Sequence, residues 1–489
     1  MSAHTIPTYE RRRPEETLLY KTIAGHLNTF LTQLAQENRM LPPHVEKELF
    51  SYLECGVLAY GFMRLQCSDC KAEQLVAFSC KKRGFCPSCC GKRMTETSTH
   101  LLDHIIPNVP IRQYVLSLPY PLRYWMASNK NLCGRVHKIL ASTVEDFYSD
   151  KKDKNTRSGS IAFIQRFGGA LNLNIHLHML QIEGCYHKKT TGCHKFKKHR
   201  SPHNDDIVKL IDKIRKRVIK LLIRLGYLQI HEYEQTEACN DPLFAEDSTY
   251  AEMMSCSVNN KIALGVRKGE KVRFIGPGFG YEQDTPKLKG YLCAESSGFS
   301  LHAGVLVKAH RRDDLRRLIG YVSRPPLCLD RLTVTEEGDI KYKFKRPWAN
   351  GKTHVVLSPL EFIEKLCALV PQPRMHLVRY SGVLAPNSKM RKGVIPGMTR
   401  AEIKAQKEAK NKDKDKDKKL VSGHQWAKLL ARVFEIDVSK CKHCGGELKI
   451  ISAIRNPTAI QKILNHLGLS PQPPPIAPAK SRGIFATIS

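Results

Sequence analysis

One segment of the chain alternates strictly between apolar and polar residues over nine positions. Its odd positions from Leu171 to Met179 are all apolar, and its even positions carry two asparagines followed by His176 and His178. This period of two predicts a half-buried strand whose odd face enters the core. Because alternate residues on one face of a strand are roughly 6.5–7 Å apart, the two imidazoles are placed to bind one cation together.

A second segment repeats its apolar residues at the helical period. Four of them follow the i, i+3, i+4, i+7 pattern, which predicts an amphipathic helix from Arg312 to Val322. Two prolines directly after Arg324 prevent its continuation. At about 100° per residue, Tyr321 falls on the shoulder of the apolar stripe, so we expect it at the edge of a cleft. Arg317 and Arg324 surround it with positive charge.

The remaining pattern divides the chain into regions of different character. We expect a helical region over 1–60, a cysteine-dense module over 61–95, a core over 96–335 and an extension of that core over 336–400. Within the core we expect strands over 161–182, 262–275 and 300–309, helices over 131–149 and 206–228, a glycine-rich turn over 275–280, and a basic helical insertion near 187–250. A charged linker over 401–419 precedes a small unit over 420–489, whose proline-rich tail is expected to be disordered.

The chain carries a large excess of positive charge. Its 489 residues include 79 lysines and arginines against 46 aspartates and glutamates, which gives a net charge of +33 with histidine neutral. This balance indicates a polyanionic partner, and nucleic acid is favoured over a membrane because no apolar run reaches the roughly 18 residues that a bilayer requires. The charged N-terminal segment lacks a signal-peptide core, so we expect a reducing cytosol, where closely spaced cysteines serve as metal ligands.

Four of the seventeen cysteines form two Cys-x2-Cys pairs that are separated by fifteen residues. This spacing is typical of two knuckles that share one tetrahedral Zn²⁺. The four expected ligands are Cys67, Cys70, Cys86 and Cys89. Cys80 and Cys90 are competing ligands, and four metal-free cysteines are the alternative. Arg83, in the basic run before the second knuckle, is a candidate contact to DNA phosphates.

A single further pair lies near the C-terminus. Cys441 and Cys444 form a Cys-x2-Cys knuckle without an obvious second knuckle beside it. His443 or a distant cysteine would complete a second zinc site there, and a metal-free turn is the alternative.

The histidine strand and the tyrosine helix each allow two interpretations. His176 and His178 are either metal ligands or ordinary residues of a polar face. Tyr321 is either a nucleophile that forms a covalent intermediate or a tyrosine at the edge of the core. Attack on a phosphodiester requires charge relief at the phosphate, which a divalent metal and arginines supply.

Taken in order, the motifs of this chain resemble a known family. They are the first Cys-x2-Cys pair, Gly84 to Cys89, Val115 to Arg123, Asn174 to His178, Ser300 to Gly304, Tyr321 to Leu327, Arg379 to Asn387 and Cys441 to Gly446. The sequence is similar to transposases of the insertion sequence 91 family, rolling-circle HUH enzymes with an N-terminal zinc-binding domain. The resemblance covers about residues 15–455. It implies an α+β fold with an HUH-nuclease core, in which helices flank an antiparallel sheet.

The resemblance also implies a chemistry for the singled-out residues. His176 and His178 would hold Mg²⁺ or Mn²⁺, and Tyr321 would attack one DNA strand to give a 5′-phosphotyrosine and a free 3′-OH. Founding members carry a second tyrosine four residues earlier, where this chain has Arg317. It therefore resembles the single-tyrosine branch.

The third metal ligand departs from the family pattern. HUH enzymes often supply it near the tyrosine helix, but four residues after Tyr321 stands Pro325, which has no ligand atom. We expect His302 in its place, with Glu183 as the alternative.

The expected partners follow from this chemistry. They are single-stranded DNA at the element ends and at the target, together with a host helicase and the replication machinery, because the chain contains no Gly-x4-Gly-Lys-Ser/Thr loop. We expect no membrane partner and a location at the nucleoid in the bacterial cytoplasm. Two alternatives share many of these features: a rolling-circle replication initiator, and a non-catalytic zinc-dependent DNA-binding protein.

Overall fold

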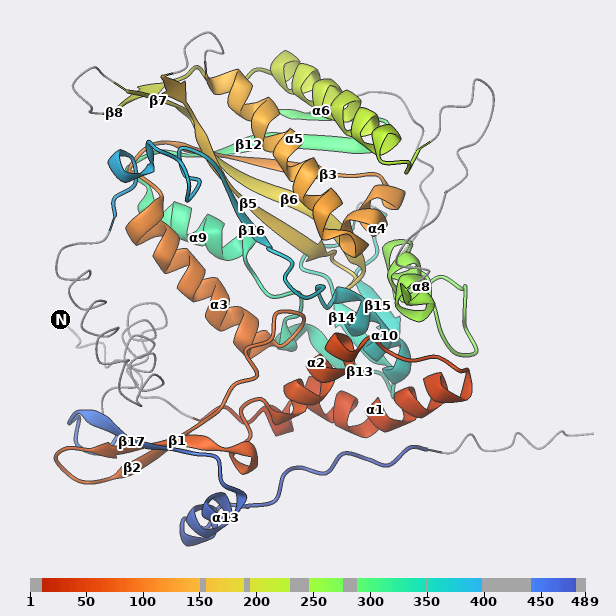
Figure 1. Ribbon diagram of the computed structural model, residues 1–489. Coiled ribbons are helices and arrows are strands. Elements are labelled where there is room, and N and C mark those ends of the chain that lie inside the picture. Colours follow the sequence, from red (N-terminus) through yellow and green to blue (C-terminus); the bar gives the residue numbers. More distant parts are fainter. Residues whose placement is uncertain are drawn as a thin grey trace, which may run out of the picture. The chain divides into compact units, whose positions relative to one another are not determined.

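A computed structural model describes residues 11–149, 155–188, 194–228, 246–275, 288–348, 350–397 and 441–480 (Figure 1). The chain divides into two compact units. Unit 1 combines residues 1–38, 46–96 and 398–489, and unit 2 combines residues 39–45 and 97–397. The expected turn over 275–280 lies almost entirely outside the described residues, and the charged linker over 401–419 lies wholly outside them. Among the described helices, none is both long and apolar enough to cross a membrane.

Unit 2 is built on a seven-stranded antiparallel sheet (Figure 1). Its strands, in spatial order, are β10 (Leu288–Gly290), β11 (Cys293–Ser296), β12 (Phe299–Val307), β3 (Ile111–Ser117), β6 (Leu173–Ile182), β5 (Gly159–Phe167) and β16 (Val378–Gly382). The inner strand β6, between β3 and β5, contains most of the alternating segment identified in the sequence. The α+β prediction is confirmed by this sheet and the helices around it.

Helices cover both faces of this sheet (Figure 1). They are α4 (Tyr120–Ser128), α5 (Lys130–Tyr148) and α6 (Asn204–Arg224) on one face and α9 (Arg312–Val322) on the other. Tyr114, in register with Met179 on the odd face, hydrogen-bonds to Tyr148 of α5. Leu180 and Ile182 of the even face pack with α9. Within the predicted segment the odd face is buried, as expected, and on the even face Asn174 and His176 are partly exposed whereas His178 is buried. Beyond His178 the even face turns apolar.

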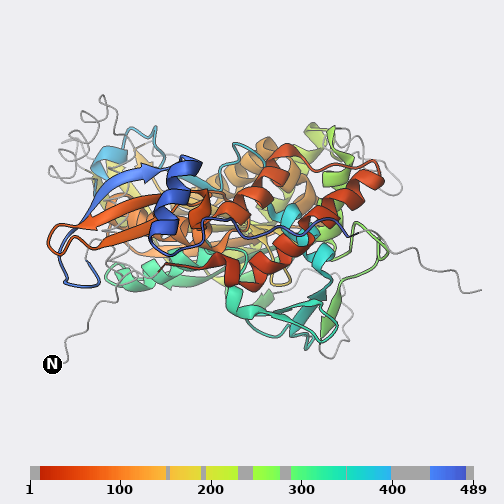
Figure 2. The same ribbon diagram turned by 90° about the horizontal axis from the view of Figure 1, so that it is seen from below.

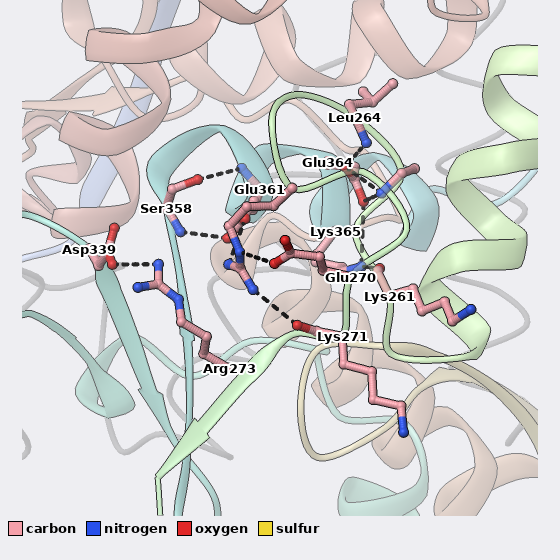
Figure 3. A network of polar contacts seen from close by, with 12 residues as sticks. Lys261, Leu264, Glu270, Lys271, Arg273, Asp339, Ser358, Glu361, Glu364 and Lys365 are labelled. Carbon is pink, nitrogen blue, oxygen red and sulfur yellow. Dashed lines mark hydrogen bonds and ion pairs between the residues drawn. The ribbon is translucent and has the colours of Figure 1, made fainter.

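A smaller four-stranded sheet follows the tyrosine helix in unit 2. Its spatial order is β13 (Leu332–Val334), β14 (Ile340–Lys343), β15 (His354–Leu357) and β9 (Arg273–Ile275), with α10 (Pro359–Leu369) following β15 and α8 (Ser248–Val258) packed on α10. Most of the expected strand region 262–275 is instead a loop. Glu364 accepts hydrogen bonds from the backbone N–H groups of Ala263 and Leu264, and Lys365 donates to the carbonyl of Lys261 (Figure 3).

The basic segment 187–204 also differs from the expectation. The described part forms a hairpin of β7 (Gly184–Lys188) and β8 (His194–Lys198), extended by β4 (Thr156–Arg157), and only then does α6 begin. The short helices among the described residues are η1 (Pro14–Glu16), η2 (Leu58–Tyr60), η3 (Leu101–Ile105), η4 (Leu329–Arg331) and η5 (Arg391–Gly393).

Unit 1 joins segments from both ends of the chain. Its elements are α1 (Leu18–Gln36), most of α2 (Pro43–Glu54), β1 (Phe62–Cys67), β2 (Glu73–Ala77), the start of α3 (Pro87–His100), β17 (Leu448–Ile454) and α13 (Pro457–His466). Strand β17 pairs with β1 to give the order β17-β1-β2 (Figure 2). The tail was expected to be disordered, but Ala477 hydrogen-bonds to the backbone of Ala24 and to the side chain of Asn28 in α1.

Candidate functional site

The two histidines of β6 lie side by side on the face that α9 covers. Their ring centroids are 4.9 Å apart. Nδ1 of His176 lies 2.9 Å from the carbonyl oxygen of Asn174. Because a carbonyl can only accept, this nitrogen carries the proton, and Nε2 of a neutral His176 is left with a free lone pair.

His178 is held by a neighbouring strand, with its proton on the other nitrogen. Its Nδ1 accepts a hydrogen bond from the side-chain amide N–H of Gln113 at 2.8 Å, so Nε2 of the neutral ring, which is buried without a hydrogen-bond partner, carries the proton. Burial lowers the pKa of His176 to about 4 and that of His178 to about 3, with further lowering by Arg324. Both rings are therefore neutral near pH 7, the form in which imidazole binds a metal.

Tyr321 lies next to this pair. Its ring meets the ring of His178 edge to face, with centroids 6.0 Å apart. The expected helix forms, and α9 buries Leu315, Ile319 and Val322 while Tyr321 stays 42% exposed. The structure thus brings together a tyrosine and a histidine pair that the sequence identified on separate elements.

Gln165 connects the histidine strand to the tyrosine helix. It lies on β5 opposite His176, and its amide donates to the carbonyls of Tyr321 (3.3 Å) and Val322 (2.8 Å) at the end of α9. These contacts hold the last turn of the helix against the sheet. The sequence did not single out Gln165, because its role depends on strand register.

Two cations flank the tyrosine ring. The guanidinium of Arg324 lies 5.0 Å from the ring centroid of Tyr321, and Nζ of Lys345 lies 5.3 Å from it. Nε of Arg324 is buried without a hydrogen-bond partner. Arg317 was expected beside Tyr321, but its side chain is 82% exposed and pairs with Asp314. The sequence did not single out Lys345, which belongs to the segment after β14.

The structure does not bring His302 to the histidine pair. His302 is in register with Val115, and Val115 is in register with His178, so a whole strand separates the two histidines, about 10 Å at the usual strand spacing. The ring of His302 lies over Gly304 instead. No group of three ligand atoms from His, Cys, Asp or Glu includes His176 or His178 within the described part of the chain. His302 is therefore not grouped with the histidine pair among the described residues, and its role as third ligand stays a prediction.

Glu183, the alternative third ligand, does not face the histidine pair. It is an odd-numbered residue next to β6, and it pairs with Arg112 at 2.7 Å on the side of the sheet away from the histidines. Ser201 and Tyr148 donate to its remaining lone pairs. It is fully buried in this network, which stabilises the fold and leaves no oxygen for a metal.

The cysteines of unit 1 gather into two clusters of four. The first contains Cys55, Cys80, Cys86 and Cys89. Its Sγ–Sγ distances include 3.7 Å from Cys55 to Cys86 and 3.4 Å from Cys80 to Cys89. Cys90, the other competing ligand, remains outside it, and burial raises the pKa of its thiol to about 12. The sequence offered no signal for Cys55, a lone cysteine just after α2.

The second cluster joins the two ends of unit 1. It contains Cys67, Cys70, Cys441 and Cys444. Sγ of Cys67 lies 3.4 Å from that of Cys444, and Sγ of Cys70 lies 3.5 Å from that of Cys441. The two N-terminal knuckles therefore do not share one site as expected. The second knuckle, Cys86 and Cys89, belongs to the first cluster. The first knuckle, Cys67 and Cys70, lies beside the C-terminal knuckle because β1 pairs with β17.

Both clusters have the geometry of a zinc site. Zn–S bonds of about 2.3 Å in a tetrahedron place sulfur atoms about 3.8 Å apart, close to the distances found here. Backbone N–H groups also point at the sulfurs, from Cys80 to Cys55 and from His443 to Cys441. Such donors stabilise thiolates. His443 contributes this N–H group, and its ring is not among the four ligands.

Arg83 lies in unit 1 between Cys80 and Cys86 of the first cysteine cluster. It is half-buried, and burial together with the nearby charge of Arg93 lowers the pKa of its guanidinium.

Two family models match this chain. One is described as "Transposase zinc-binding domain" and matches residues 24–118, and the other is described as "Putative transposase" and matches residues 159–392. The first match includes the first cysteine cluster but not Cys441 or Cys444, and the second includes His176, His178 and Tyr321. No curated protein and no solved structure matches the chain.

Proposed function

This chain belongs to the insertion sequence 91 family of transposases, and from this premise we propose that it cuts and rejoins single-stranded DNA at the ends of its element. The observation that carries the proposal is the contact between Tyr321 and His178, whose ring centroids are 6.0 Å apart. It places a partly exposed nucleophile beside two neutral imidazoles, of which His176 has a free lone pair on Nε2.

The proposed reaction is a transesterification. The Oη atom of Tyr321 attacks the scissile phosphorus, and the bond from phosphorus to the 3′-oxygen breaks. The phenol loses one proton and the leaving 3′-oxygen gains one, so no net proton is consumed or released. The 5′-phosphate remains on Tyr321. Because one phosphodiester replaces another, a 3′-OH can reverse the step and rejoin a strand without an external energy source.

The histidine pair fits a divalent cation. Nε2 of His176 would hold Mg²⁺ or Mn²⁺, which would supply charge relief to the phosphate oxygens when bound. Nε2 of His178 would join it after the Gln113 amide turns its oxygen toward Nδ1 and the ring proton moves to Nδ1. The hydrogen bond from Nδ1 of His176 to the carbonyl of Asn174 already orients the first ring for this purpose.

Three arginines and one lysine are proposed to contact DNA. Arg324 and Lys345 lie over Tyr321 and would neutralise the phosphate under attack. Arg317 projects from the exposed side of α9 and would bind a phosphate of the flanking strand. Arg83 would serve the same purpose in unit 1.

The four cysteines of each cluster are proposed to bind one structural Zn²⁺. The zinc-binding domain match covers the first cluster, and the geometry of the second is equivalent. A host helicase would provide the single strand, since the chain has no phosphate-binding loop of the Gly-x4-Gly-Lys-Ser/Thr type. Host replication would then use the freed 3′-OH, which places the protein at the bacterial nucleoid.

The test is cleavage of single-stranded oligonucleotides that tile the element ends, with Mg²⁺ or Mn²⁺. Wild type should form a covalent protein–DNA adduct, and Tyr321→Phe should form none. Tyr291→Phe is the matched control, because Tyr291 is also an exposed tyrosine of unit 2, and it should react like wild type. Binding without an adduct in wild type would reject the catalytic proposal and favour a zinc-dependent DNA-binding protein.

A second measurement separates transposition from replication initiation. An adduct that transfers its strand to the 3′-OH of a second, unrelated DNA supports the transposase. An adduct that rejoins only its own strand would favour a replication initiator.

A further inference from the structure

One face of the four-stranded sheet in unit 2 is lined by lysines. Along β14 and the residues after it, Ile340, Tyr342 and Phe344 are buried. The alternating Lys341, Lys343 and Lys345 point to the opposite side, where Lys343 and Lys345 are exposed and Lys341 is half-exposed. We call these three residues the lysine face. None of them forms an ion pair with any residue that the structure describes.

The neighbouring strands add little negative charge to this face. Lys341 is in register with Thr333 of β13 and Val356 of β15, and Lys343 with His354. Asp339, the acidic residue directly before β14, is already paired with Arg273 of β9 at 2.7 Å (Figure 3). The uncompensated charge affects His354, whose pKa is lowered by burial and then by Lys341 and Lys343.

The lysine face ends at the tyrosine. Lys345, its last member, lies over the ring of Tyr321. Three residues later, Trp348 stacks on Phe344 with centroids 4.9 Å apart and an interplanar angle of 16°. The indole Nε1 of Trp348 lies against Gly169, in the turn between β5 and the histidine strand β6. The same short segment therefore touches both elements of the proposed active site.

The sheet that carries the lysine face is held firmly in place. Arg273 ties β9 to the turn before β14, and Glu361 accepts hydrogen bonds from Arg267 and from the backbone N–H of Ser358 (Figure 3). The buried pair of Glu364 and Lys365 fixes the loop that leads into β9. A rigid sheet can hold a row of cations at a constant spacing, which reduces the ordering cost of binding an extended polyanion.

We propose that the lysine face binds the phosphates of the single DNA strand that runs into Tyr321, and that Trp348 stacks with a base next to the cleavage position. A row of cations beside an aromatic ring is the usual composition of a single-strand site. Lysines on alternate positions of a strand are roughly 7 Å apart, a repeat suited to the phosphates of an extended strand. This inference rests on the proposed function, because it assigns the approach path to the same tyrosine.

The test measures the affinity of the full-length protein for a fluorescent oligothymidylate of about 20 nucleotides. Lys341→Ala combined with Lys343→Ala should weaken binding several-fold and reduce the slope of log K against log salt by about 1.4, or 0.7 per lost phosphate contact. The matched control is Lys209→Ala combined with Lys220→Ala, which removes the same charge from exposed positions of α6. The control should bind like wild type.

Trp348 gives a second readout. The chain has three tryptophans, and stacking of a base on Trp348 should quench part of their fluorescence when oligothymidylate binds. Trp348→Phe, which keeps an aromatic ring, should remove most of that quenching while preserving most of the affinity.

Several outcomes would overturn the inference. Equal weakening by the α6 control would show a general charge effect, and equal weakening for a DNA duplex of the same length would remove the preference for a single strand. Because binding needs no cleavage, the two proposals fail separately. Normal binding by the lysine variant with normal adduct formation rejects only the lysine face, whereas weakened binding together with an inactive wild type rejects only the proposed chemistry.

Discussion

At the scale of single residues, Gln165 is the side chain that connects the helix of Tyr321, the proposed nucleophile, to the strand of the histidine pair, the proposed metal ligands. It lies opposite His176 and donates to the carbonyls of Tyr321 and Val322. Its removal would free the last turn of α9 without touching either histidine or the tyrosine ring. A misplacement of about 1 Å at a reacting atom can reduce a rate by roughly 100-fold.

We therefore expect Gln165→Leu to slow adduct formation by about 10- to 100-fold at saturating DNA, with little change in DNA affinity. Single-turnover kinetics measure the rate, and fluorescence anisotropy measures the affinity. Gln181→Leu is the matched control, because Gln181 is another buried glutamine of unit 2 that donates to Ser158 instead. If both variants slow the reaction equally, the effect is one of general stability and Gln165 has no positioning role.

A second residue-scale prediction concerns acid stability. His137 of α5 is buried, its Nε2 has no hydrogen-bond partner, and its pKa is lowered to about 4 by burial and then by Arg379. The unfolded chain binds this proton below about pH 6.5, but the folded chain does not. The contribution of neutral His137 to the free energy of unfolding is therefore fully present above about pH 6.5 and is lost as the pH falls. The free energy of unfolding should decrease by about 2 kcal/mol between roughly pH 7 and pH 5.

We expect His137→Leu to remove this acid sensitivity. Guanidinium unfolding of wild type and variant at the two pH values measures the difference in free energy of unfolding. His310→Leu, at an exposed position, serves as the control and should keep the pH dependence of wild type. An unchanged pH dependence in His137→Leu would contradict the prediction.

Which residues could be predicted from the sequence depended on whether their signal was local. Tyr321 and the histidine pair stood out because each sits in a periodic pattern within one element. Gln165 and Lys345 did not, since each reaches the site through strand register or through a segment remote from the helix. The separation of His302 from the histidine pair was not predictable for the same reason, because only register shows that Val115 lies between it and His178.

At the scale of elements, the two cysteine clusters show how a strand pairing determines metal ligands. Strand β17 lies against β1, and this brings Cys441 and Cys444 to Cys67 and Cys70. The first cluster uses only N-terminal residues. The two sites therefore share no ligand, and each should be removable without loss of the other.

We expect the purified wild type to contain close to two zinc ions per chain, because it has two complete sets of four ligands. Cys441→Ser combined with Cys444→Ser should reduce this to one. Metal content by mass spectrometry measures the ratio. Cys256→Ser combined with Cys293→Ser is the control, because neither residue belongs to a cluster, and it should keep both ions. A wild type with one zinc would contradict the second site.

Of the expected strands, the sequence located β6 correctly but not the segment 262–275. The alternation through His178 correctly located β6, but its continuation into Leu180 and Ile182 already signalled burial on both faces. The region 262–275 was expected to form a strand, but only Arg273–Ile275 does. Around the start of the region, the buried Glu364 and Lys365 of α10 capture the backbone groups that a strand would have used, which no local pattern reveals.

At the scale of the whole molecule, the chain organises its ends into one unit and its middle into the other. The contact between Cys67 and Cys444 spans 377 positions, so no local feature of the sequence could predict it. Closing such a loop is entropically costly, and a metal bound by four thiolates is a strong compensating interaction. Unit 2 has its own extensive core and no cysteine cluster among its described residues.

This division predicts a selective response to zinc removal. With a chelator under reducing conditions, amide hydrogens of β1 and β17 in unit 1 should lose their protection from exchange, because the pairing of these strands depends on the second cluster. Amides of β5 and β6 in unit 2 should stay protected, since both faces of their sheet are covered by helices and need no metal to pack. Hydrogen exchange followed by mass spectrometry resolves the two regions.

Restored zinc provides the control for this experiment, because it should return the protection of β1 and β17 and leave that of β5 and β6 unchanged. A uniform loss of protection over both units would show that the fold of unit 2 depends on the zinc sites, and the two units would then act as one cooperative structure. A uniform retention would show instead that the sheet of unit 1 forms without metal. In that case the short distances among the eight cysteines would follow from strand pairing alone, and the clusters would bind zinc only as a consequence of a fold already complete.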